Sequence, residues 1–169
     1  MIVCMASGNG SNFEAIVKSG IKIELVITNR PTARVIERAK KYNIPCIFNS
    51  TEYEACVPKN TKLVVLAGFM RILSNSFTET LSGKIINIHP SLLPKFKGLN
   101  TFERALENKE KKTGCTVHYV NSKLDDGRII LKKKFYINFK DNVETLKHKT
   151  QKLEYKAYPE AIIKVFRDF

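Results

Sequence analysis

The segment IINIHPSLLP holds an amide and an imidazole at a spacing that suits a reaction with a tetrahedral oxyanion and a proton to relocate. Asn87 and His89 are two residues apart in an apolar run, and Pro90 follows directly. Residues two apart in a β-strand point to the same face, and a proline ends the strand. An asparagine amide donates to an oxygen that becomes negative, and histidine titrates near neutral pH. A histidine at a strand end is often only structural, but the same-face asparagine favours a reaction through an oxyanion.

A carboxylate is expected beside such a histidine, and the turn KLDDGR offers Asp125 and Asp126. Asp-Gly pairs are also common in hairpin turns, so a purely structural role is an alternative. The residues alone do not bring either aspartate to His89. No serine or cysteine lies in a nucleophile-elbow motif, so the sequence predicts no covalent intermediate.

A glycine-rich turn, SGNGSNF, follows the first apolar run. It has the first two glycines of G-x-G-x-x-G, but Phe13 stands in place of the third, which disfavours a nicotinamide or flavin cofactor. Gly8 and Gly10 allow close approach of the backbone to a ligand, and Ser11 and Asn12 would open a helix whose dipole favours anions. We predict a phosphate-binding turn; the alternative is a plain turn in which Ser11 or Asn12 caps the helix.

These candidates follow strands of a predicted α/β fold. Short apolar runs alternate with helix-length segments as far as Gly98, which is typical of crossovers in a parallel sheet. The predicted strands are residues 1–7, 22–29, 44–48, 62–68, 84–89, 113–120 and 127–137. Helices are expected at 12–20, 32–43, 74–83 and 100–109 and from about Asn142, with Pro159 breaking or kinking the last one. We therefore expect an open, mostly parallel sheet with helices on both faces.

Length and composition limit the function classes. With 169 residues, of which 43% are hydrophobic, the chain fits one domain over 1–169. Its four cysteines are scattered, which suggests neither a disulfide framework nor a zinc site. No run reaches the ~18 apolar residues of a membrane helix, so we expect a cytoplasmic protein without a membrane partner. The net charge of +13 is spread over several lysine-rich segments, which favours a solvated surface over a nucleic-acid partner.

The ordered segments SGNGSN, LAGFMRIL, NIHPSLLP, GLNTFERALEN, GCTVHYV, LDDGRIIL and LEYKAYP together resemble the 10-formyltetrahydrofolate-dependent formyltransferase family. The resemblance spans nearly the whole chain, and SGNGSN and LEYKAYP resemble the branch that acts on 5′-phosphoribosylglycinamide (GAR). It implies a Rossmann-like formyltransferase domain that transfers a formyl group from 10-formyltetrahydrofolate to the amine of GAR in purine biosynthesis. It also implies two small-molecule substrates, no metal, no nucleic acid, and a monomer or homodimer.

The resemblance further implies roles for single residues. Asn87, His89 and Asp125 match the catalytic positions of the family. The implied GAR-binding residues are Gly10, Ser11, Asn12 and Glu154. The implied folate-binding residues are Met70, Arg71, Ile72, Leu73, Asn87, Asn121, Leu124 and Asp125.

The sequence departs from the family pattern at several positions. Asn100 and Phe102 replace histidines, and the region between Asn49 and Lys62 is shorter than usual. Asp126 places a Cβ and a charge where the family has a flexible glycine. These departures bear on the rate and on folate affinity.

Three other functions stay open on the residues alone. A methionyl-tRNA formyltransferase would share NIHPSLLP, but its second domain has no room in 169 residues. A formyltetrahydrofolate hydrolase would normally have an additional N-terminal regulatory domain. A non-catalytic module that binds nucleic acid or phosphorylated ligands through basic residues is the third alternative.

Overall fold

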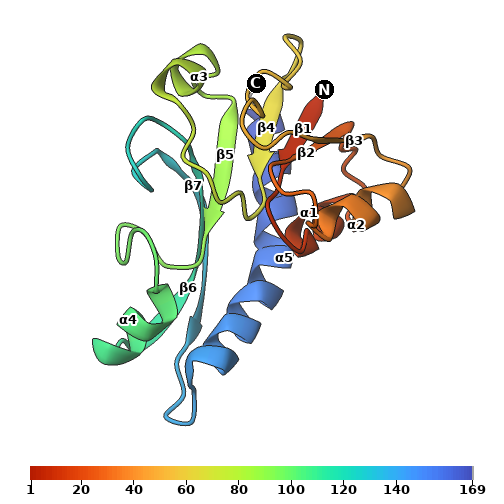
Figure 1. The fold of residues 1–169 in the computed structure, drawn as a ribbon. Coiled ribbons are helices and arrows are strands. Elements are labelled where there is room, and N and C mark those ends of the chain that lie inside the picture. The colour runs from red at the N-terminus through yellow and green to blue at the C-terminus, as the bar shows by residue number, and fades with distance from the viewer. Residues whose placement is uncertain (169) are drawn as a thin grey trace. The chain divides into compact units, whose positions relative to one another are not determined.

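The computed structural model describes residues 1–168, whose strands form a seven-stranded sheet in the order β3-β2-β1-β4-β5-β6-β7 (Figure 1). Their contacts group them into two compact units, residues 1–87 and residues 88 onward. The strands are β1 (Ile2–Met5), β2 (Leu25–Thr28), β3 (Cys46–Phe48), β4 (Leu63–Leu66), β5 (Ile85–His89), β6 (Lys112–Tyr119) and β7 (Ile129–Tyr136). The helices are α1 (Ser11–Lys18), α2 (Val35–Lys41), α3 (Asn75–Thr80), α4 (Thr101–Glu107) and α5 (Val143–Arg167).

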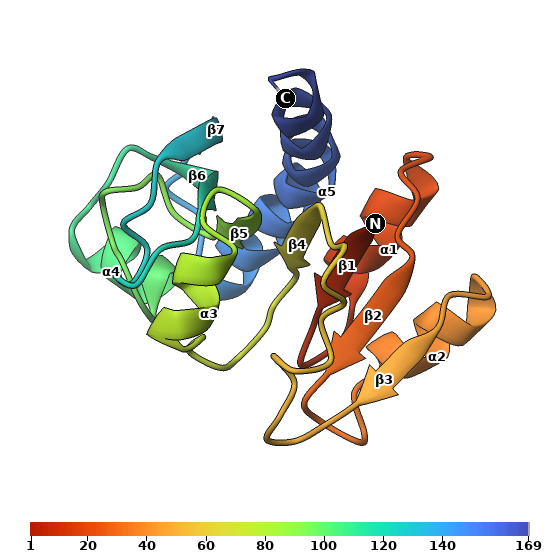
Figure 2. The ribbon, with the colours of Figure 1, turned by 90° about the horizontal axis from the view of Figure 1, so that it is seen from above.

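In the first unit the strands pair in parallel. β1 pairs with both β2 and β4, β2 pairs with β3, and the start of β5 pairs with β4. All residues of β2 and β4 are buried, which explains why these strands are apolar throughout instead of alternating. Helix α2 packs on β2 and β3 (Figure 2). Because the strands are parallel, the turns after β1 and β4 lie at the same edge of the sheet.

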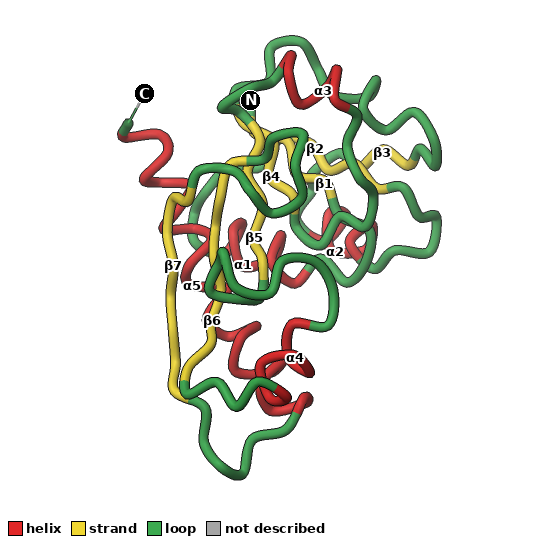
Figure 3. Tube along the Cα trace, turned by 90° about the vertical axis from the view of Figure 1, so that its left-hand side faces the viewer, coloured by secondary structure: helices red, strands yellow, loops and turns green. Residues whose placement is uncertain are grey.

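In the second unit β6 and β7 form a long antiparallel pair, seen as two adjacent strands in Figure 3. Their register shifts between Val117 and His118, which marks a β-bulge. Helix α5 packs against both strands. The side chain of its N-cap, Asn142, accepts from the Thr145 N–H at 2.9 Å, and the Thr145 hydroxyl accepts from the Asn142 N–H. This capping box fixes the start of the helix.

The α/β class with a mostly parallel sheet is confirmed, and each predicted strand and helix has a counterpart. The prediction that Pro159 breaks the last helix is wrong, because α5 continues through it to Arg167. A proline removes a single backbone donor, and its ring here is buried, so packing offsets that loss. That residues 1–169 act as one domain stays a prediction. Among residues 1–168, no helix has the length and apolar character needed to cross a membrane.

Candidate active site

His89 is the last residue of β5, and its ring is held by a main-chain oxygen. The side chain is buried, and its Nε2 lies 2.8 Å from the carbonyl oxygen of Phe96. A carbonyl only accepts, so this contact assigns a hydrogen to Nε2. Asn87 lies two residues earlier on the same strand and is half-buried. Both residues lie in β5, so the alternation of the strand places their side chains on the same face.

Asp125 is the carboxylate beside His89. Its Oδ2 lies 3.4 Å from Nδ1 of His89 and accepts from the Gly98 N–H at 2.8 Å. The aspartate side chain is only 7% exposed. With Nε2 already carrying a hydrogen, Nδ1 needs a second proton to bond to the carboxylate. The arrangement therefore fits an imidazolium–carboxylate pair.

A second histidine, His118, also faces Asp125 and was not predicted from the sequence. Its Nε2 lies 3.7 Å from Asp125 Oδ1, and its Nδ1 lies 2.9 Å from the Tyr119 carbonyl. Burial is the main cause that lowers the pKa of His118. Its only sequence signal is an imidazole in a largely apolar and hydroxyl-bearing strand. The register shift between Val117 and His118, where this ring lies, has no signature in the sequence.

Asp126 turns to a different partner. Its carboxylate forms an ion pair with Lys97, and the hydrogen bond from Lys97 is the main cause that lowers its pKa. The left-handed backbone of this loop occurs at Asp125 (φ 48°), while Asp126 is not among the residues of positive φ in the described chain. Aspartate tolerates that conformation better than most residues. The glycine expected at 126 is therefore not required by the backbone of this chain.

The rest of this loop is tightly built around Gly127. A Cβ at this position would lie 1.7 Å from the carbonyl oxygen of Tyr119, so only glycine fits. The side chain of Asn121 accepts from the Lys123 N–H at 2.9 Å and stabilises the turn. Leu124 is 64% exposed, as a residue offered to a ligand would be.

The glycine turn after β1 is fixed by packing as well as by its conformation. Gly10 (φ 74°) is the N-cap of α1, which has no side-chain cap, so the alternative with Ser11 or Asn12 as the cap is wrong. A Cβ on Gly10 would lie 2.7 Å from Val35 Cγ2, whereas Gly8 has open space. Gly10 therefore serves helix packing in addition to any ligand. Ser11 and Asn12 are the first two residues of α1, where backbone donors and the helix dipole favour an anion.

The loop after β4 is tied to this turn within the first unit. The Met70 N–H donates to Ser7 Oγ at 2.7 Å, and Ser7 in turn donates to Asn29 Oδ1 at 2.6 Å. Met70 and Ile72 are 62% and 86% exposed, and Arg71 is exposed as well. Exposed apolar side chains at this edge suit a flat apolar ligand. Leu73, by contrast, is buried.

The remaining predicted residues lie in α4 and α5. Glu154 is buried in α5, and after burial itself it is the second cause that raises the pKa of the Cys115 thiol to about 12. Asn100, which replaces a family histidine, is the N-cap of α4 in left-handed conformation (φ 57°). Phe102 lies in α4 and is half-buried. Cys4 and Cys115 are buried free thiols, and Cys46 and Cys56 are half-buried free thiols.

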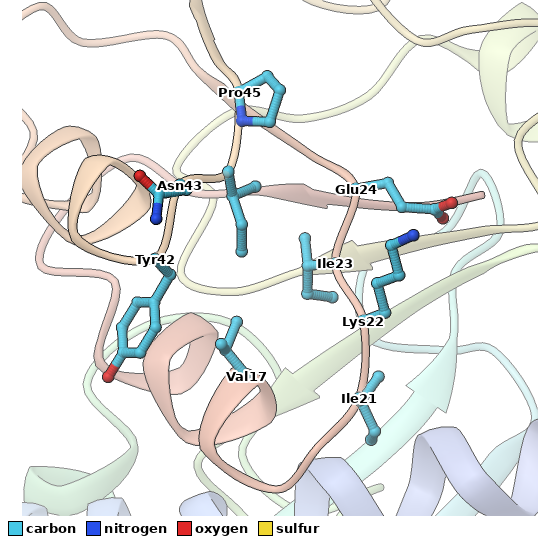
Figure 4. Close-up of a pocket in the computed structure, with 9 residues that line it drawn as sticks. Val17, Ile21, Lys22, Ile23, Glu24, Tyr42, Asn43 and Pro45 are labelled. Carbon is cyan, nitrogen blue, oxygen red and sulfur yellow. The ribbon is translucent and has the colours of Figure 1, made fainter.

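A cavity of about 460 Å³ lies elsewhere in the first unit (Figure 4). It is lined by Val17, Ile21, Lys22, Ile23, Glu24, Tyr42, Asn43, Ile44 and Pro45. Several of these residues immediately precede β2 and β3, so the cavity lies at the amino ends of those strands. Ligands of open α/β sheets bind at the carboxyl ends, and no predicted site residue lines this cavity. Within residues 1–168, no group of three or more His, Cys, Asp or Glu side chains is arranged to hold a metal ion.

Comparison with known proteins identifies the family of this chain. The formyl transferase family model matches residues 1–162. The phosphoribosylglycinamide formyltransferase of Haemophilus influenzae is 40% identical, with 99% of this chain and 87% of the relative covered. The enzyme of that name from Bacillus subtilis is also 40% identical, with 93% and 90% covered. The solved structure of the Coxiella burnetii phosphoribosylglycinamide formyltransferase, in complex with CHES, has a TM-score of 0.89 at 41% identity, with 97% of this chain and 84% of the other covered. This chain therefore belongs to the formyl transferase family.

Proposed function

We propose that this chain is a folate-dependent phosphoribosylglycinamide formyltransferase of purine biosynthesis. It transfers the formyl group of 10-formyltetrahydrofolate to the amine of GAR. The observation that carries this assignment is the buried His89–Asp125 pair at the end of β5, in a chain 40% identical over nearly its full length to enzymes of that name. Formyl transfer to an amine requires that a proton be moved, and the His89–Asp125 pair is titratable.

The proposed chemistry begins when the GAR amine attacks the formyl carbon and negative charge develops on the formyl oxygen. We assign stabilisation of that charge to the Asn87 amide and protonated His89. His89 Nδ1 and Asp125 Oδ2 are 3.4 Å apart, close enough for the carboxylate to stabilise an imidazolium electrostatically. Asp125 then supports the imidazolium and helps move a proton to the leaving nitrogen. The donor supplies the formyl group and that leaving nitrogen.

We assign the GAR phosphate to Gly10, Ser11 and Asn12, because backbone donors at a helix N-terminus bind anions and the Ser11 hydroxyl adds a side-chain donor there. Glu154 is assigned to the glycinamide end, where a carboxylate suits an amine. The net charge of +13 would also attract the anionic substrates.

The folate ring system is assigned to two loops, 70–73 and 121–125. Their exposed apolar side chains, Met70, Ile72 and Leu124, fit a flat heterocycle. Arg71 and Asn121 would add polar contacts, and Leu73 would contribute through its main chain because its side chain is buried. No residue is assigned to a metal. The proposed enzyme acts in the cytoplasm as a monomer or homodimer, without a nucleic acid.

The test is release of tetrahydrofolate from 10-formyltetrahydrofolate in the presence and absence of GAR. Release that depends on GAR, with formyl-GAR as product, is expected. Release without GAR would indicate a hydrolase, and formylation of methionyl-tRNA would indicate the tRNA enzyme. Salt-sensitive binding of random oligonucleotides without formyl transfer would favour a non-catalytic basic module.

A further inference from the structure

One short segment of backbone contacts both members of the reacting pair. The Phe96 carbonyl lies 2.8 Å from His89 Nε2, and the Gly98 N–H donates to Asp125 Oδ2 at 2.8 Å. The segment Phe96–Gly98 therefore fixes the ring of His89 and the carboxylate of Asp125 at the same time. Any shift of this segment changes both contacts together.

The backbone of this segment is in a conformation that it would not hold unaided. Phe96 has a φ of 56°, which is uncommon for a bulky residue, and Gly98 and Asn100 also have positive φ. Such residues lower the stability of the fold and persist only where their surroundings hold them. Glycine and asparagine reduce that cost at 98 and 100, so Phe96 is the residue that most needs support.

Arg104, from the first turns of α4, supplies that support. Its Nη1 donates to the Lys97 carbonyl at 2.6 Å and to the Leu99 carbonyl at 3.1 Å. Its guanidinium also lies over the Phe96 ring, 5.2 Å from the centroid. The contacts thus hold the ring of Phe96 and the carbonyls on either side of Gly98.

A second contact, or tie, attaches the segment Phe96–Gly98 to the loop that contains Asp125 and Asp126. The Lys97 ammonium pairs with Asp126, the residue that replaces the family's glycine. Both side chains are a little more than one-third exposed, so this tie is the weaker of the two. Two cations therefore attach the segment, one from within it and one from α4.

We propose that Arg104 is a positioning residue for formyl transfer, which holds the Phe96 carbonyl on His89 Nε2 and so fixes the tautomer of the reacting ring. This rests on the proposed function for its kinetic consequence, but not for its structural one. With the Phe96 carbonyl in place, Nε2 keeps its hydrogen, and Nδ1 is the nitrogen whose proton is exchanged. Without that carbonyl, the proton of a neutral ring would move to Nδ1, beside Asp125. The Lys97–Asp126 pair assists by limiting movement of the segment.

The test compares Arg104→Met with the unsubstituted protein by ¹⁵N NMR of the histidine rings and by kinetics. The chain has only three histidines, so the ring signals are few. At a pH where the rings are neutral, the unsubstituted protein should show His89 protonated on Nε2. In Arg104→Met the Nδ1-protonated form should rise, and kcat should fall about tenfold with KM for GAR changed less than twofold. Arg104→Lys should recover part of the loss.

The matched control is Lys95→Met. Lys95 lies in the same loop, but its ammonium pairs with Glu110 at 3.0 Å and not with the segment. Its removal should leave both the His89 spectrum and kcat unchanged. Asp126→Asn, which cuts the second tie without altering α4, should lower kcat about two- to fivefold, and it serves if Arg104→Met does not fold.

Several results would overturn the proposal. One is a His89 ring protonated on Nδ1 in the unsubstituted protein. Another is an Arg104→Met protein that folds and keeps both the original His89 spectrum and its kcat. A loss in Lys95→Met as large as in Arg104→Met would also reject it. If GAR is not formylated at all, the proposed function fails, and the NMR comparison still decides whether Arg104 sets the ring.

Discussion

Replacing Asp125 with asparagine is the most informative single change, because it removes the charge while keeping the shape and backbone. Asp125 has a φ of 48°, and asparagine is the non-glycine residue that tolerates this conformation best. The side-chain oxygen of asparagine still accepts from the Gly98 N–H. An alanine would instead combine a lost charge with backbone strain. The effect of Asp125→Asn therefore reports on the carboxylate itself.

The size of the effect follows from the contacts of the carboxylate. Asp125 is 7% exposed and faces His89 Nδ1 at 3.4 Å, so its interaction with an imidazolium is screened little by solvent. A hydrogen bond to a charged group contributes about 1.5–3 kcal/mol. At ~1.36 kcal/mol per factor of ten, kcat should fall by about 10- to 160-fold. With the asparagine oxygen kept on the Gly98 N–H, that neutral oxygen faces His89 Nδ1 in place of a charged one, and the amide NH2 lies on the side of His118. The imidazolium then loses its counter-charge, so the pH dependence of kcat should change shape.

The assay measures tetrahydrofolate release with saturating GAR across pH, because a fixed-pH assay confuses a moved optimum with a lost group. Asp126→Asn is the neighbouring control, since Asp126 pairs with Lys97 and not with His89. It should lose only a few-fold in kcat and keep the pH profile. If Asp125→Asn retains more than half of kcat with an unchanged profile, or if Asp126→Asn is the more damaging of the two, the assignment of Asp125 is wrong.

Three further predictions follow from the site. His89→Ala and Asn87→Ala should each lower kcat by about 100-fold or more with circular dichroism unchanged, as oxyanion donors do, and near-normal turnover in both would reject that role. Ser11→Ala should raise KM for GAR about tenfold, while KM for the folate stays within twofold. The reason is that a hydrogen bond to a charged group contributes about 1.5–3 kcal/mol. Equal changes in both KM values would contradict the assignment of this turn to the phosphate. Because burial lowers the pKa of His118 below 6.5, the unfolded chain takes up a proton first as pH falls through 6.5, so Tm should drop below that pH. A folded His118→Asn protein should show a flatter dependence of Tm on pH, and an unchanged slope would show that His118 is not the group responsible.

Much of the fold could be predicted because the relevant information is local. The apolar runs that became β2 and β4 are buried on both faces, and so the sequence shows them as continuous stretches. The facing of Asn87 and His89 follows from strand alternation alone. Pro159 was misjudged because its effect depends on tertiary packing, which buries the ring within α5.

The second half of the site depends on contacts distant in sequence. Nothing local indicates that Phe96 adopts a positive φ or that its carbonyl meets His89. The register shift beside His118 is likewise a property of the pairing between β6 and β7. The sequence suggested a catalytic role for a carboxylate in the turn, but choosing Asp125 over Asp126 required the family resemblance, and the structure gives each aspartate a different partner.

The fit of Gly127 against Tyr119 has a consequence for how the chain tolerates changes in length. Because a Cβ at position 127 would lie 1.7 Å from the Tyr119 carbonyl, no other residue can occupy that point of the backbone. An insertion or deletion between Asp125 and Gly127 would move the carboxylate relative to the glycine, whereas one before Asp125 would leave that interval intact. The number of residues between Asp125 and Gly127 is therefore fixed by the packing of Gly127 against Tyr119. Loop exchange between members of the family should succeed only when that two-residue interval is kept, whatever side chains fill the rest of the loop.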